Sequence, residues 1–373
     1  MVAEGIRVAG SPEARENQAP DTRAAAGQPG PAAAGSKAAD SAAAWTGLTR
    51  AYRPGDAAAW DDLVARSANG TILHTRKFLA YHGDRFRDRS LVVTKSNGKL
   101  TGVLPAAEDP ADPSVVTSHP GLTYGGLVHD GTLYGGLLIE ALAGVAAEYR
   151  AQGFRRLRYR AVPSIYHSSP AADDQYALSR LGADRYRRDL AAVIKLAHRG
   201  RVWSGRKAWR KRAETAGVRT EENWDDIAGY WRILEENLAA RHDATPTHSL
   251  AEIEYLHEQF PTEVVLLTAK LGDTLVAGNL FIVEGPVLQA RYTATTSEGR
   301  TVSATDLVIE HGIALAAARG CEFYSMGTST LDEGRQLNES QYAFKVSFGG
   351  GGVIHETCEL DLERVLDRAE LPG

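Results

Sequence analysis

Apolar positions along this chain follow the same order of strand and helix periods twice. Residues 91–108 and 266–284 each hold two apolar runs, joined by Asn97-Gly98 in the first case and by Gly272-Asp273 in the second. Such a pair between apolar runs is a strong signal for a β-hairpin. After each hairpin the pattern continues as strand, helix and strand, and each helix ends at a glycine, which is a common helix stop. The helices are expected at 137–150 and 306–319, and the strands after them at 154–160 and 322–326.

This repetition predicts an α/β fold with mixed sheets and helices, built as two tandem copies of one unit. Between the copies we expect a helix at 174–182, a strand at 190–196 and a basic helix at 202–216. An amphipathic helix then opens the second copy, because Ile227, Tyr230, Trp231, Leu234 and Leu238 recur at spacings of three and four. The expected divisions are a disordered Ala/Gly/Pro-rich tail (1–45), the first copy (46–200), a basic linker helix (201–222) and the second copy (223–373).

Composition narrows the class of protein. With 43% hydrophobic and 24% charged residues in 373, the chain is globular rather than disordered as a whole. Two cysteines cannot make a disulfide framework or a four-thiolate zinc site. The histidines lack the spacing of a metal motif, so we expect no metal and no tightly bound cofactor. No apolar run is long enough to span a membrane and no secretion signal precedes the fold, so we expect a cytoplasmic protein.

Charge is unevenly distributed along the chain. The formal net charge is −5, yet residues 150–219 contain 18 Lys or Arg and 5 Asp or Glu. A basic centre in an acidic protein indicates an anionic ligand. The alternative is a set of solvated arginine-rich faces, and the sequence leaves both interpretations open.

Four segments, taken in order, resemble the motifs of a known family. Residues 162–167 read VPSIYH and 174–178 read DQYAL; 206–218 contain RKAWRKRAE and AGV; 238–250 read LAARHDATPTHSL; and SMGTS at 325–329 precedes QYAFKVSFGG at 341–350. Together with the duplication, these resemble the FemABX group of peptidoglycan-bridge aminoacyltransferases and their BioF2-like relatives. Only about 30 residues separate Leu196 from Ile227, so the smaller members that lack a coiled-coil arm are the better comparison.

The resemblance implies two copies of the N-acetyltransferase (GNAT) fold and an N-acyltransferase that forms an amide bond. Acyl-CoA enzymes of this fold hold pyrophosphate in an R/Q-x-x-G-x-A/G turn, which residues 300–305 (RTVSAT) match poorly. An aminoacyl-tRNA donor instead needs an extended basic surface, which Arg206, Lys207 and Arg210 supply. Trp203 and Trp209 lie between these cations and can stack on bases. The competing interpretation is a surface helix whose tryptophans face the core.

Candidate site residues follow from the resemblance and from the chemistry of amide formation, which needs an uncharged amine and a stabilised oxyanion. Lys345 is the candidate for stabilising the oxyanion, and His242 for taking the amine proton. The donor-binding candidates are Arg206, Lys207, Arg210, Arg291, Tyr292 and Asn338, the last in a polar loop expected to act as a substrate lid. The acceptor-binding candidates are Tyr124, Gly125, Tyr166 and His167.

We therefore expect transfer of an aminoacyl group from aminoacyl-tRNA to an amine on a small-molecule or peptidoglycan-precursor acceptor. Transfer from an acyl-CoA is the alternative within the enzyme class. A non-catalytic protein that binds anionic ligands or RNA on the same fold is the alternative outside it.

Overall fold

The structure is a computed structural model and describes residues 47–242 and 245–365. It confirms both predicted hairpins: β2 (Leu91–Thr94) pairs with β3 (Leu100–Leu104), and β10 (Val264–Leu271) pairs with β11 (Thr274–Glu284). Their turns need the left-handed backbone that glycine adopts easily, with φ of 81° at Gly98 and 60° at Gly272. The expected tail, residues 1–45, lies outside the described residues.

The helices and strands after the hairpins also occur as predicted. In the first copy they are α3 (Gly136–Ala151) and β7 (Arg156–Arg160), and in the second α9 (Ala304–Ala318) and β13 (Phe323–Thr328). Both helices are apolar over most of their length and pack into the cores of their copies. Each helix ends just before a glycine with positive φ, Gly153 in the first copy and Gly320 in the second. The predicted ends of both helices are therefore confirmed.

The remaining elements complete two units with the same order of parts. The first copy adds β1 (Leu48–Ala51), α1 (Ala57–Arg66), α2 (Arg76–Leu79), β4 (Ala107–Asp109), β5 (Asp112–Thr117), β6 (Val128–His129), α4 (Asp173–Arg180) and β8 (Asp184–Lys195). The basic helix α5 (Ser204–Thr215) follows. The second copy adds β9 (Val218–Glu222), α6 (Ile227–His242), α7 (Leu250–Gln259), β12 (Val287–Thr295), α8 (Ser297–Thr301), β14 (Thr330–Leu331), β15 (Gln336–Leu337), α10 (Glu339–Val346) and β16 (Gly351–Asp361).

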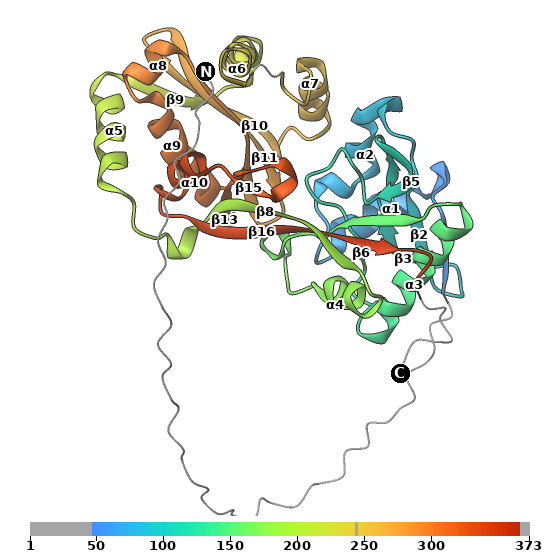
Figure 1. Cartoon of the computed structure of the whole chain (residues 1–373). Coiled ribbons are helices and arrows are strands. Elements are labelled where there is room, and N and C mark those ends of the chain that lie inside the picture. Colours follow the sequence, from blue (N-terminus) through green and yellow to red (C-terminus); the bar gives the residue numbers. More distant parts are fainter. Residues whose placement is uncertain (1–46, 243–244, 366–373) are drawn as a thin grey trace, which may run out of the picture. The chain divides into compact units, whose positions relative to one another are not determined.

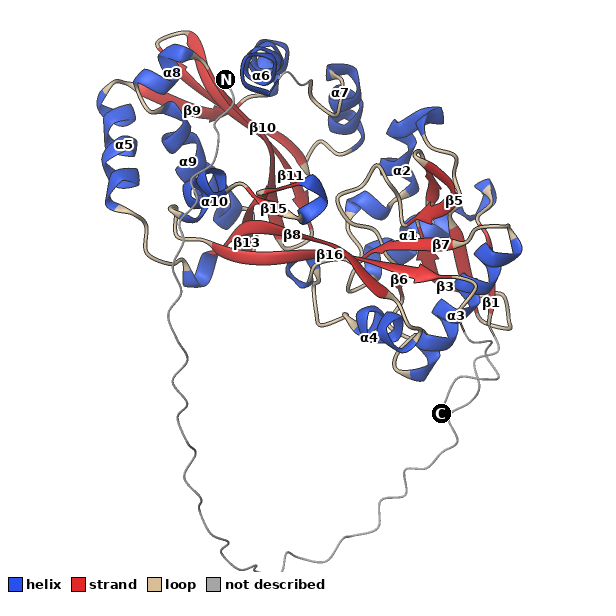
Figure 2. Cartoon of the chain, in the orientation of Figure 1, coloured by secondary structure: helices blue, strands red, loops and turns tan. Residues whose placement is uncertain are grey.

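The two copies exchange their last strands. A ten-stranded sheet runs β4-β5-β7-β16-β8-β13-β12-β11-β10-β9, so the last strand of each copy lies beside the penultimate strand of the other. β16 and β8 also pair with each other along nine positions. Figures 1 and 2 show these two long strands crossing from one copy to the other. The exchange joins strands of both copies into one hydrogen-bonded sheet, whereas β1, β2, β3 and β6 of the first copy form a separate four-stranded sheet.

Some predicted boundaries need correction. The strand expected at 190–196 begins at Asp184, because its outer half pairs with β16, a partner that the local sequence does not reveal. Asn223 caps a short 3-10 turn, Trp224–Asp226, and α6 begins only at Ile227. The expected lid loop contains the β14–β15 hairpin. β9, within the expected linker, pairs with β10, so the division at residues 200 and 223 stays a proposal.

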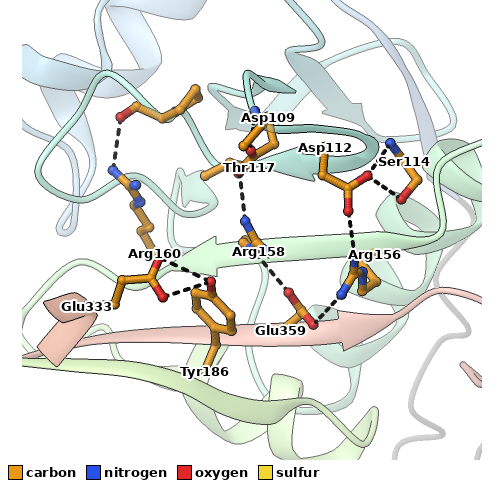
Figure 3. A network of polar contacts seen from close by, with 12 residues as sticks. Asp109, Asp112, Ser114, Thr117, Arg156, Arg158, Arg160, Tyr186, Glu333 and Glu359 are labelled. Atoms are coloured by element: carbon orange, nitrogen blue, oxygen red, sulfur yellow. Dashed lines mark hydrogen bonds and ion pairs between the residues drawn. The ribbon is translucent and has the colours of Figure 1, made fainter. Parts of the chain in front are cut away.

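Much of the basic excess at residues 150–219 is neutralised by acidic residues from other parts of the chain. On β7, Arg156 contacts Asp112 and Glu359, and Arg158 contacts Asp109 and Glu359, all within 3.5 Å (Figure 3). These arginines hold the β4–β5 hairpin and β16 against β7. The solvated-face interpretation is therefore wrong for them, and so is the anion-site interpretation.

The exchanged strand should contribute to the stability of the opposite copy. Leu360 on β16 is 1% exposed and packs in the first copy's core, whereas Ile354 on the same strand is 48% exposed. We expect Leu360→Ala to lower the free energy of unfolding by about 2–5 kcal/mol, and Ile354→Ala by no more than about 0.5 kcal/mol. Urea unfolding measures both; equal effects of the two variants would contradict the exchange.

Candidate active site

A gap between two parallel strands forms the base of the site. β12 and β13 pair only over Val287–Gln289 and Phe323–Ser325. Beyond this point β13 continues along β8, while β12 remains paired with β11. A bulge in β12 leaves Arg291 unpaired between Ala290 and Tyr292, opposite β11. Bulges turn side chains and increase twist, and this one lies where the strands separate.

Two clefts meet at this gap. The first, which we call the α5 cleft, has a volume of about 740 Å3 and lies among α5, α6, α9, α10 and β12. The second, the central cleft, has a volume of about 630 Å3 and lies between the copies. Residues from the gap and from α10 line both clefts: Ala290, Arg291, Tyr292, Met326, Gln341 and Lys345. A ligand in one cleft can therefore reach a ligand in the other.

Lys345 lies on α10 at the junction of the two clefts. Its Nζ donates hydrogen bonds to the carbonyl oxygens of Thr328 at 2.6 Å and Gly327 at 3.2 Å. Among the described residues no carboxylate lies within 4 Å of it, and burial lowers the pKa of Lys345 to about 8. An ammonium group has three N–H donors, so one remains for a ligand. The arrangement provides a positive charge that is partly desolvated and held in place.

Arg206 joins the three helices around the α5 cleft. Its guanidinium donates to Asp306 Oδ1 at 2.9 Å and to Ser347 Oγ at 2.7 Å. It also lies 4.3–4.8 Å from the ring centroids of Trp209, Phe344 and Phe348. Arg206 therefore acts as a packing centre between α5, α9 and α10, in addition to lining the cleft.

Arg291, Tyr292 and His248 form the wall shared with the central cleft. Arg291 donates to Thr123 Oγ1 of the first copy at 2.6 Å. The Tyr292 hydroxyl lies 2.7 Å from His248 Nδ1 and 2.6 Å from Thr247 Oγ1. Burial, assisted by the charge of Arg291, lowers the pKa of His248 to about 3, so this imidazole is neutral at pH 7. Its Nε2 has no partner among the described residues.

The remaining donor candidates, Lys207 and Arg210, lie on the exposed face of α5, where Ala213 is the one buried residue of the helix. Arg210 forms an ion pair with Glu214 one turn later. Among the described residues no carboxylate lies within 4 Å of these basic residues of α5 and its approach: Arg201, Lys207, Lys211 and Arg212. Trp203 and Trp209 are 56% and 43% exposed, so the expectation that they face the core is wrong.

The four acceptor candidates make contacts within the fold, and none of them lines either cleft. Tyr124 and Tyr166 are 1% exposed, and their hydroxyls donate to Glu284 and Gln289. A side chain at Gly125 would collide with the Ser118 carbonyl. His167 Nε2 lies 3.1 Å from the Val162 carbonyl oxygen. Their contact with an acceptor stays a prediction.

Asn338 lies at the start of α10, and His242 lies at the end of α6. The Asn338 side chain caps α10 by accepting from the Gln341 amide at 3.1 Å, so it supports the helix that carries Lys345. His242 is the last residue of α6, and its side chain lies outside the described part of the structure. His248, six residues later in the same motif, lines the central cleft, as does His355 on β16.

A repeated motif in the sequence marks the position of Lys345. Gln175-Tyr176-Ala177 on α4 and Gln341-Tyr342-Ala343 on α10 occupy equivalent places in the two copies. Lys345 then corresponds to Ser179, which is exposed. This repeat, read together with the hairpins, would have located α10 and shown that the second copy alone has the lysine at this position.

Comparison with known proteins agrees with this geometry. Residues 199–342 match the family described as acetyltransferase (GNAT) domain. FemX is similar over 86% of this chain and 98% of its own, with a TM-score of 0.58 and 13% identity. A lysylphosphatidylglycerol synthetase C-terminal domain from Agrobacterium fabrum has a TM-score of 0.55 and 11% identity over 84% of this chain and 96% of its own. No curated protein sequence matches.

This chain has the FemX-like tandem GNAT fold. The L-PGS protein from Bacillus licheniformis shares it, with a TM-score of 0.54 and 11% identity over 82% of this chain and 91% of its own. The matched region includes α5, the strand gap and the first half of α10 but ends before Lys345, and it supports an acyltransferase. In the described residues, no helix is long and apolar enough to cross a membrane, and no group of three or more His, Cys, Asp or Glu is arranged to hold a metal ion.

Glu284 lies beneath the site and makes stability depend on pH. It is 0% exposed and accepts a hydrogen bond from Tyr124 at 2.6 Å, and its Oε1 has no hydrogen-bond partner in the part of the chain that the structure describes. Burial raises the pKa of this carboxyl above its ordinary value of 4.5. The folded state then binds the proton more tightly than the unfolded state, so stability falls as pH rises from 4.5 to the raised value.

Glu284→Gln keeps an acceptor for Tyr124 and has no proton to lose. We expect this variant to be more stable than the native protein at pH 8, with the difference shrinking toward pH 4.5. Urea unfolding at several pH values measures this difference. A difference that does not vary with pH would show that the carboxyl keeps an ordinary pKa in the fold.

Proposed function

We propose that this protein transfers an aminoacyl group from aminoacyl-tRNA to an amine on a small-molecule or peptidoglycan-precursor acceptor. The donor occupies the α5 cleft and the acceptor amine enters from the central cleft. One observation carries the proposal: Lys345, with a free N–H and a partly desolvated charge, lies where the two clefts meet. The cytoplasmic location expected from the sequence agrees with a tRNA donor.

In the reaction, the amine nitrogen attacks the carbonyl carbon of the aminoacyl ester. Negative charge develops on the carbonyl oxygen, and the Lys345 ammonium stabilises it. This attack forms the C–N bond; the C–O bond to the ribose then breaks, and the proton that the nitrogen loses ends on the departing ribose oxygen. His248, whose imidazole is neutral at pH 7, also lines the central cleft that the amine enters. His242 remains the sequence-based candidate for removing the proton.

The charge on α5 supports tRNA as the donor. Arg201, Lys207, Lys211 and Arg212 have no carboxylate nearby in the described structure, and Arg212 lines the α5 cleft. Unpaired cations along an exposed helix can neutralise several successive phosphates, which a polynucleotide has and a small donor lacks. Arg291 and Tyr292 in the cleft wall and Asn338 at the start of α10 would then act at the ester end of the donor.

One observation favours acyl-CoA as an alternative donor. Ser303, at the glycine position of the pyrophosphate turn, adopts the left-handed conformation with φ of 62°, so the turn that opens α9 keeps a glycine-like shape. However, the Asp306 carboxylate lies in the first turn of α9 and is paired with Arg206. Repulsion from this carboxylate disfavours a pyrophosphate there, so we give preference to tRNA.

Replacing Lys345 separates an enzyme from a non-catalytic binding protein. We expect Lys345→Ala to reduce the rate of transfer by roughly 10²–10³-fold and to leave donor affinity almost unchanged. Single-turnover transfer and donor titration measure the two effects. Lys99→Ala, on the β2–β3 hairpin away from both clefts, is the matched control. Equal losses of rate in the two variants would remove Lys345 from the mechanism.

The pH dependence of the transfer rate shows whether Lys345 acts as the ammonium ion or as the neutral amine. The pKa of about 8 means that the ammonium form prevails at pH 7 and is lost above pH 8. We expect kcat/KM to rise with pH as the acceptor amine loses its proton, and to level off near pH 8. Lys345→Arg, which stays protonated, should be slower but should continue to rise. A rate that steepens above pH 8 would instead identify neutral Lys345 as a base.

Salt dependence of binding tests the donor. We expect aminoacyl-tRNA affinity to fall steeply with salt, and the Lys207→Ala, Lys211→Ala double variant to reduce the slope of log K against log[salt] by about 1.5. A Lys95→Ala, Lys99→Ala variant, with the same change of charge on the first-copy hairpin, should keep the slope. If instead CoA binds at micromolar concentration and the tRNA affinity is the same in the Lys207→Ala, Lys211→Ala variant as in the native protein, the donor is an acyl-CoA.

A further inference from the structure

We infer that the indole of Trp209 is a stacking platform for the adenine at the end of the acyl donor. This inference rests on the proposed function for the identity of the donor, and concerns a subsite that the transfer chemistry does not itself require. Trp209 lines the α5 cleft together with Lys345, so a base on the indole and an ester at the lysine share one cavity.

The inner side of the indole is fixed by the protein. The Arg206 guanidinium lies 4.6 Å from the indole centroid and, on α10, 4.3 Å from the ring centroid of Phe344. The ion pair with Asp306 holds the guanidinium in place. A Cβ at Gly205 would lie only 3.3 Å from the indole, so the ring rests directly on the backbone of α5 at a residue without a side chain. The ring therefore needs little ordering when a ligand binds.

The outer side of the indole is exposed and flanked by positive charge. Trp209 is 43% exposed although it is a large apolar side chain, so part of the indole is open to a ligand. Arg212, three residues later on α5 and also in the cleft wall, has no carboxylate within 4 Å in the described structure. A flat, electron-rich ring next to a cation without an acidic partner fits a nucleotide, whose base stacks on the ring while its phosphate meets the cation.

Adenine is the base expected at this position. A tRNA ends in an adenosine that carries the aminoacyl ester, and CoA also contains an adenosine, so both possible donors bring the same base. Trp203 provides a natural comparison, because it is on the same helix approach and is 56% exposed, but it does not line the α5 cleft. The platform is therefore assigned to Trp209 alone.

The test uses the full chain and three probes: the RNA trinucleotide CCA, the same trinucleotide with an abasic 3′ end, and adenosine 3′,5′-bisphosphate, which represents the nucleotide of CoA. Affinities are measured by calorimetry for the native protein, Trp209→Ala and Trp203→Ala. We expect the native protein to bind CCA roughly tenfold or more tightly than the abasic probe. That preference should disappear in Trp209→Ala and remain in Trp203→Ala. Thermal unfolding checks that the exposed substitutions leave the fold intact.

The outcomes separate the platform from the donor. A preference for CCA that survives in Trp209→Ala, an equal loss in Trp203→Ala, or binding of every adenine probe that does not depend on Trp209 would overturn the inference. If the bisphosphate alone binds, and does so through Trp209, the platform stands while the tRNA donor fails. If the Lys345 variants lose transfer but no adenine probe depends on Trp209, the proposed function stands and the platform fails.

Discussion

The pairing of β16 between β7 and β8 is the constraint on which the rest of this structure depends. β16 of the second copy lies between β7 and β8 of the first, and β8 also pairs with β13 of the second, so the ten-stranded sheet is complete only with strands from both copies. Main-chain hydrogen bonds along β16 bring the C-terminal residues Cys358 and Leu360 into the core of the first copy. The relative placement of the two copies, and therefore the shape of the central cleft, follows from this pairing.

The position of the candidate active site also depends on the strand exchange. α10 lies in the chain directly before β16, so the strand exchange also fixes the helix that carries Lys345. The lysine is held further by carbonyl oxygens at the end of β13, and α10 is packed against α5 through Arg206. In the Arg206–Asp306 ion pair the side chains are 11% and 10% exposed, so removing these charges from water costs free energy. Here the ion pair acts together with stacked rings, which favours one geometry of the three helices.

The two copies share one fold but contribute different residues to the site. Lys345 and the β12 and α9 residues of the α5 cleft belong to the second copy, whereas the first copy contributes Thr123, Tyr81 and their neighbours to the central cleft. At the position equivalent to Lys345 the first copy has Ser179. A single pair of substrates can then meet at one reactive centre, approached from two sides.

Sequence by itself determined the duplication, both hairpins, the two apolar helices and the basic character of α5, because periodicity, turn residues and helix stops are local properties. It could not determine the exchange of β8 and β16, since strand partners far apart in the chain leave no local signal. It also could not separate arginines that make ion pairs within the fold from cations open to a ligand. Arg158 and Arg206 look alike in sequence, but acidic residues from distant segments neutralise both. Lys207 and Lys211 have no acidic partner within the described ranges 47–242 and 245–365. Only the tertiary structure determined which aromatic residues are buried: Tyr124 and Tyr166 lie in the core, whereas Trp209 lies at the surface.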